Sequence, residues 1–191
     1  MSRIDYDDAY ANAAYIPEAD GFIEEWQNDA HAFRTDLISK KRADIDVVYG
    51  PSKRQVFDVF HPVGEAKGTL VFVHGGYWRR FDKSYWSHFA TGALERGWRV
   101  VMPSYDLCPR VSIAEITQEI RVCVERIAEQ FDGPLALAGH SAGGVFFYLN
   151  ISNSFPLNFF ETSKQAELFS IFPSEIILKL FSFSVEPVEV I

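Results

Sequence analysis

Eleven residues, Leu135–Val145 (LALAGHSAGGV), constrain the fold of this chain most strongly. An apolar run ends there in GHSAG, residues 139–143, which is the pattern G-x-S-x-G. The pattern predicts a strand that turns sharply into a helix, with its central residue strained and small residues where strand and helix nearly touch. A serine at such an apex presents its hydroxyl at a helix N-terminus, where a nucleophile is useful. Ser141 is therefore the first candidate catalytic residue.

Strand-like and helix-like segments alternate before this turn. Apolar or β-branched runs predict strands over 43–49, 55–60, 69–73, 98–102 and 134–138, the first two as a hairpin. Helices are expected from Asp82 or Ser84 to Leu94, and over 113–131 behind a capping box of Ser112 with Glu115. This order predicts a three-layer α/β fold with a mostly parallel sheet and right-handed crossovers. Loops at the carboxyl ends of the strands would then form the site.

The first 42 residues are expected to form a helical N-terminal extension. One helix is predicted over 5–14 and a second from Asp20 to Leu37, where apolar side chains recur at helical spacing. Such a segment is either an amphipathic cover packed on the domain or a cap over its substrate side.

The predicted strand 69–73 ends directly in His74–Trp78, HGGYW. Together with GHSAG, this loop resembles the front half of an α/β-hydrolase, over about residues 45–144 and more loosely 1–44. The sequence HGGYW is similar to the corresponding loop in the arylformamidase (kynurenine formamidase) branch of the esterases and lipases. The resemblance implies a Ser141 acyl-enzyme that hydrolyses a small ester or amide, such as the aryl formamide N-formylkynurenine. It implies no metal and no organic cofactor.

The resemblance also implies an oxyanion hole. Its backbone N–H donors would come from Ala142, which follows the nucleophile, and from Gly75, Gly76 and Tyr77 of the other loop. Losing one such donor costs on the order of 3 kcal/mol of transition-state stabilisation.

The remaining loop residues have less specific roles. His74 is expected to brace its loop by hydrogen bonds, and His140 fills the variable position of the turn with its side chain directed away from that of Ser141. Tyr77 and Trp78 either line a pocket for an aromatic substrate or pack in the core.

The pattern of the family breaks at Val145. In the family the acid and then the histidine of the triad follow the serine, but all five histidines here lie at or before position 140 and no aspartate follows Ser141. Residues 145–191 also lack glycine, arginine and tryptophan, and hold nine of the 17 phenylalanines. We therefore expect residues 1–144 to be the N-terminal part of a hydrolase domain, truncated after the strand that leads into the GHSAG turn, which we call the elbow. Residues 145–191 are expected to be an unrelated Phe-rich tail. The alternative is a divergent C-terminal half of the same domain.

Two hypotheses about function follow from this break. The chain is either a serine hydrolase whose base comes from elsewhere, or a catalytically inactive hydrolase remnant with a binding role or none. Removing members of a triad leaves only the modest catalysis that the oxyanion hole and binding supply.

Composition limits the classes of binding partner that are expected for this chain. The chain has 191 residues and a net charge of −8, which argues against nucleic acid or an anionic membrane surface. No apolar stretch approaches the length of a membrane span. Two cysteines and an acidic N-terminus favour a reduced, cytoplasmic protein. We expect a small-molecule substrate, and homo-oligomers if a truncated sheet exposes an apolar edge.

Overall fold

The computed structural model describes residues 5, 8 and 11–151. Its centre is a five-stranded sheet in the order β1-β2-β4-β3-β5. The strands are β1 (Ala43–Val48), β2 (Val56–Phe60), β3 (Thr69–Val73), β4 (Arg99–Pro103) and β5 (Leu135–Gly139). The hairpin β1–β2 and the pair β2–β4 are antiparallel, whereas β3 pairs with both β4 and β5 in parallel. All five predicted strands are present, with ends that shift by at most one residue.

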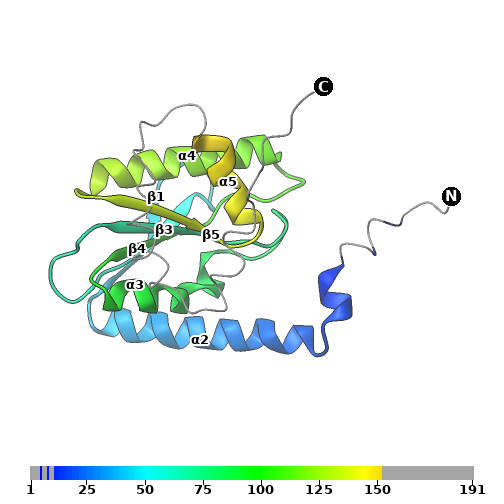
Figure 1. The fold of residues 1–191 in the computed structure, drawn as a ribbon, viewed down its shortest axis with the longest axis horizontal. Coiled ribbons are helices and arrows are strands. Elements are labelled where there is room, and N and C mark those ends of the chain that lie inside the picture. Colours follow the sequence, from blue (N-terminus) through cyan, green and yellow to red (C-terminus); the bar gives the residue numbers. More distant parts are fainter. Residues whose placement is uncertain (1–4, 6–7, 9–10, 152–191) are drawn as a thin grey trace, which may run out of the picture.

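Helices cover both faces of the sheet, as the three-layer prediction requires. Helices α2 (Ala19–Ser39) and α3 (Thr91–Glu95) lie on one side, and α4 (Ile113–Gln130) and α5 (Ala142–Ile151) lie on the other (Figure 1). Strand β3 supplies both cores: Leu70 and Phe72 pack with the α2 side, Val71 and Val73 with the α4 side. A parallel strand covered on both faces is apolar throughout, which is what the run 69–73 indicated.

The capping box of α4 forms as predicted. The Ser112 hydroxyl accepts a hydrogen bond from the Glu115 amide at 3.2 Å, and the Glu115 carboxylate accepts one from the Ser112 amide at 2.7 Å. Local sequence alone determines this helix start, because both residues lie within one turn.

The predicted helix from Asp82 or Ser84 to Leu94 is wrong as a continuous element. Two 3₁₀ helices, η2 (Lys83–Tyr85) and η3 (Ser87–Ala90), precede the short α3. The break is at Trp86, whose φ of −121° is not helical. Its buried ring packs against Trp26 with centroids 5.1 Å apart. Burying this large ring outweighs helical continuity, because tertiary packing routinely overrides propensity.

The N-terminal prediction is met in part. Helix α2 begins at Ala19 rather than at Asp20, after Glu18 in a left-handed conformation with φ of 55°. In the stretch 5–14 the described residues contribute Asp8, which is helical, and the start of a 3₁₀ helix, η1 (Asn12–Tyr15). Helix α2 packs along the sheet through buried Ala30 and Leu37, which is the behaviour of a cover. Its N-terminal end runs past the side of the sheet at which β5 ends (Figure 1).

A buried ion cluster joins α2 to the sheet. Asp58 of β2 is fully buried and pairs with both Arg34 of α2 and Lys83 of η2, the latter at 2.9 Å. Lys83 also pairs with Asp46 of β1 at 2.6 Å, and the Asp46 amide donates to Asp58 at 3.0 Å. Four elements, α2, β1, β2 and η2, therefore meet at the Asp58 carboxylate.

Strand β5 is the last strand of the sheet among the described residues. The first residues of the expected tail, 145–151, continue the elbow helix α5. The rest of the tail lies outside the described residues, so its origin stays a prediction. No helix in the part of the chain that the structure describes is both long and apolar enough to cross a membrane.

Candidate active site

Ser141 occupies the turn between β5 and α5 that the pattern predicts. Its φ of 52° lies in the left-handed region, which is unfavourable for a residue with a side chain. Bonds from the Gly143 amide to the His140 carbonyl and from the Gly144 amide to the Ser141 carbonyl, both 2.9 Å, hold the turn. Ser141 is exposed at this apex, so its hydroxyl is accessible at the start of α5.

The last glycine of the pattern is required by a close backbone approach. A Cβ on Gly143 would lie 2.3 Å from the carbonyl oxygen of Val73 and 2.6 Å from that of His74. Helix α5 therefore begins in contact with the carboxyl end of β3, and only a residue without a side chain fits there.

The loop after β3 lies directly against the elbow. A Cβ on Gly75 would lie 2.7 Å from the His140 carbonyl oxygen and 2.9 Å from the Cβ of Ser141. Gly76, with φ of 114°, forms the next turn, in which its carbonyl accepts hydrogen bonds from the Arg79 and Arg80 amides at 3.0 Å each. The structure thus brings the two sequence motifs together.

Two further loop residues carry backbone strain. Tyr77 and Trp78 both have left-handed φ angles, 54° and 58°. Non-glycine residues persist in this region only when the surrounding structure holds them. Trp78 is held by its carbonyl, which accepts from the Cys108 amide at 2.8 Å, and by its ring, which packs on the α4-side core. Tyr77 is 48% exposed. Of the two aromatic residues, Trp78 packs on the core and Tyr77 is exposed to solvent.

His74 braces the loop rather than facing its opening. The ring is 1% exposed, stacks on Tyr105 with centroids 4.4 Å apart, and donates from Nδ1 to the Gly75 carbonyl at 2.7 Å. The Tyr105 hydroxyl in turn donates to the His74 carbonyl at 2.8 Å. Burial lowers the pKa of His74 to about 4, so the imidazole is neutral at pH 7.

His140 lies against the loop after β3, because a Cβ on Gly75 would come within 3.1 Å of its Nδ1. Its ring lies against Trp86, with centroids 5.3 Å apart, on the α2 side of the sheet. Two of the other histidines are placed elsewhere: His61 pairs with Asp44 at 2.7 Å, and His88 packs on Phe89.

Arg54 is a structural part of the site that the sequence did not reveal. From the β1–β2 turn, its guanidinium donates to the Tyr105 carbonyl at 2.7 Å and to the Phe81 carbonyl at 2.6 Å. It thereby ties together the loops that follow β3 and β4. Asp106, buried beside them, accepts from the Ser52 hydroxyl at 2.9 Å. No local pattern marks an arginine in a hairpin turn for such a role.

The described residues include no group of three or more His, Cys, Asp or Glu side chains arranged to hold a metal ion. What they bring together is a strained serine, backbone N–H groups at a helix start, and a glycine loop packed on both. This arrangement suits attack on a carbonyl and stabilisation of the resulting oxyanion.

Solved structures with the same architecture are esterases and related enzymes. A protein from Silicibacter sp. TM1040, provisionally assigned as a thioesterase, is 52% identical with a TM-score of 0.71, over 75% of this chain and 54% of that chain. Esterase B from Lactobacillus rhamnosis is 20% identical with a TM-score of 0.51, over 68% of this chain and 49% of that chain. The fold is that of an α/β-hydrolase.

Among curated proteins, this α/β-hydrolase chain is similar to kynurenine formamidase from Drosophila melanogaster, with 31% identity over 114 residues. The match covers 56% of this chain and 38% of the relative, so the chain spans well under two thirds of the proteins it resembles. The predicted resemblance to the α/β-hydrolases and to their kynurenine formamidase branch is confirmed. No protein-family model matches the chain.

Proposed function

We propose that this chain carries the acyl-transfer site of a serine hydrolase that acts on a small ester or amide. By resemblance, the substrate is an aryl formamide such as N-formylkynurenine, since the curated relative is a kynurenine formamidase. The observation that carries the proposal is the packing of Gly75 on Ser141 while Ser141 holds a left-handed φ of 52°. A serine in an ordinary helix cap needs neither the strain nor the second loop.

In the proposed reaction, the Ser141 oxygen attacks the substrate carbonyl carbon and its proton passes to a base. The negative charge that develops on the carbonyl oxygen is bound by the N–H of Ala142 and by those of the loop Gly75, Gly76 and Tyr77. The amine or alcohol then leaves with a proton, and water hydrolyses the acyl-enzyme. Glycines in the loop allow its backbone to approach the oxyanion closely.

The described histidines are poorly suited to act as the general base that accepts the Ser141 proton. The Nδ1 of His74 is bonded to the Gly75 carbonyl inside the core, and His140 packs on Trp86. No histidine follows Ser141 in the sequence. This distribution favours a second candidate function, a catalytically inactive remnant of a hydrolase that binds a ligand or a partner.

Turnover of 4-nitrophenyl acetate and of N-formylkynurenine by the chain and by Ser141→Ala separates the two candidates. Sustained turnover that Ser141→Ala abolishes, after a burst stoichiometric with protein, supports the hydrolase. Equal rates for the two proteins support the remnant. A fluorophosphonate probe that labels the chain but not Ser141→Ala would show a reactive serine even where turnover is too slow to measure.

A further inference from the structure

Three exposed arginines lie on two loops at the edge of the sheet that carries Ser141. Arg79 and Arg80 lie in the loop after β3, and Arg110 lies in the loop after β4. The Cys108 amide joins these loops by donating to the Trp78 carbonyl at 2.8 Å. Because β3 and β4 are parallel neighbours, both loops leave the same edge of the sheet, the edge at which the elbow lies.

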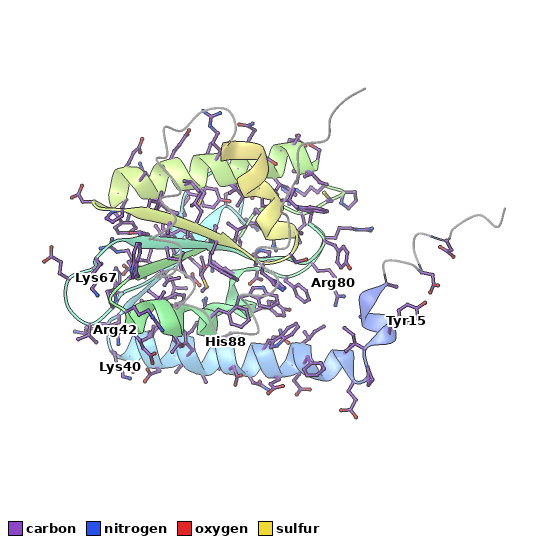
Figure 2. The ribbon with its side chains drawn as sticks, in the orientation of Figure 1. Tyr15, Lys40, Arg42, Lys67, Arg80 and His88 are labelled. Atoms are coloured by element: carbon purple, nitrogen blue, oxygen red, sulfur yellow. The ribbon has the colours of Figure 1, made fainter. Side chains whose placement is uncertain are left out.

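Arg79 and Arg80 belong to the same loop as the candidate oxyanion residues Gly75 and Gly76. Both of their amides donate to the Gly76 carbonyl, and a Cβ on Gly76 would lie 2.4 Å from the Arg80 carbonyl oxygen. Gly75, the preceding residue, is the one that packs on Ser141. The Arg80 guanidinium lies over the Phe81 ring, 5.0 Å from its centroid. Figure 2 shows Arg80 at the side of the molecule where the β5 arrow ends.

Nearby acids do not neutralise these charges. None of the three arginines takes part in an ion pair with any residue that the structure describes. The acids of the same loops have other partners: Asp82 accepts from the Ser84 amide and hydroxyl, and Asp106 is buried beside Ser52. The chain as a whole carries a net charge of −8. Three unpaired exposed cations therefore create a local positive potential against an acidic background.

We propose that Arg79, Arg80 and Arg110 form a binding site for an anionic group, a carboxylate or a phosphate, on the substrate. This inference rests on the proposed acyl-transfer site at Ser141, beside which the anion would be held. Guanidinium groups bind both anions through paired N–H donors. The substrates of this site are then anionic esters or amides in preference to neutral ones, and the anion fixes which carbonyl reaches Ser141.

Equilibrium binding to Ser141→Ala tests the proposal without any hydrolysis. Isothermal titration calorimetry compares hippurate, an aryl amide with a carboxylate, with its neutral counterpart hippuramide, and adds phenyl phosphate as the phosphate probe. We expect hippurate, phenyl phosphate or both to bind about five- to tenfold more tightly than hippuramide at low salt, since exposed ion pairs contribute modestly. This preference should fall with added salt and vanish when all three arginines are changed to glutamine. Which of the two anions binds more tightly identifies the carboxylate or the phosphate as the preferred group.

A matched variant removes the same kind of charge elsewhere. Lys67 is exposed and lies at the opposite side of the molecule from Arg80 (Figure 2). Lys67→Gln should keep the anion preference in the Ser141→Ala background. Equal affinity for hippuramide and both anionic probes, or an equal loss in Lys67→Gln and in the arginine variants, overturns the proposal. Because no turnover is needed, a preference for anions can stand even where the hydrolase test at Ser141 fails.

Discussion

Gly75 lies so close to Ser141 that a Cβ on the glycine would come within 2.9 Å of the Cβ of the serine. The same added atom would lie 2.7 Å from the His140 carbonyl oxygen, which belongs to the backbone and has little room to move. The loop after β3 and the elbow after β5 are thus fitted to each other, and a side chain at position 75 must separate them.

We therefore expect Gly75→Ala to lower Ser141-dependent turnover, or the rate of Ser141 labelling by a fluorophosphonate, by about 100-fold, the effect of losing one oxyanion donor. Gly21→Ala is the control, because a Cβ there meets nothing within 4 Å and the residue lies in α2. Its labelling rate should equal that of the parent. An unchanged rate in Gly75→Ala would count against the oxyanion assignment.

The two glycines at the start of α5 should differ sharply in tolerance. A Cβ on Gly143 would lie 2.3 Å from the Val73 carbonyl oxygen, whereas one on Gly144 has its nearest contact at 3.5 Å. We expect Gly143→Ala to lower the free energy of unfolding by about 2–3 kcal/mol, as overpacking does. Gly144→Ala should leave it unchanged or raise it by up to about 1 kcal/mol, through helix propensity. Urea denaturation of both variants measures the difference, and equal effects would mean that α5 does not pack on β3 as described.

Sequence was sufficient where a feature depends on neighbouring residues. The elbow at Ser141, the capping box of Ser112 with Glu115 and the buried run 69–73 were predictable, because turn sterics, capping and apolar patterning act within a few positions. The same reasoning paired the two loop motifs, since the carboxyl ends of parallel strands share one edge of the sheet.

Sequence was insufficient where the partner is distant along the chain. Trp86 interrupts a helix that its neighbours favour, because Trp26, sixty positions earlier, supplies the surface on which it packs. Arg54 and Asp58 likewise have ordinary sequence surroundings, and their roles depend on carbonyls and cations from other elements. No pattern among neighbouring residues predicts such contacts.

The ion cluster at Asp58 should be essential for stability despite its cost of desolvation. Replacing Lys83 by methionine leaves the fully buried Asp58 carboxylate with one cationic partner fewer. We expect a loss of about 3–5 kcal/mol in the free energy of unfolding, the usual effect of breaking a buried pair. Lys40→Met breaks the exposed pair with Asp36 and should cost less than about 0.5 kcal/mol. Comparable losses in the two variants would show that the buried cluster contributes no more than a surface pair.

His74 should make the fold sensitive to acid. Burial lowers its pKa to about 4, below the ordinary value of 6.5 that it regains on unfolding. Between pH 6.5 and 4 the unfolded chain therefore binds more protons at this residue than the folded chain, so stability is fully present above pH 6.5 and falls as pH decreases toward 4. The contribution lost across this window is about 3 kcal/mol. Urea denaturation at a series of pH values should show a shallower slope in His74→Gln than in the parent, whereas His31→Gln, at an exposed position, should keep the parent slope. A His74→Gln profile parallel to that of the parent would show that this imidazole is not held neutral by the core.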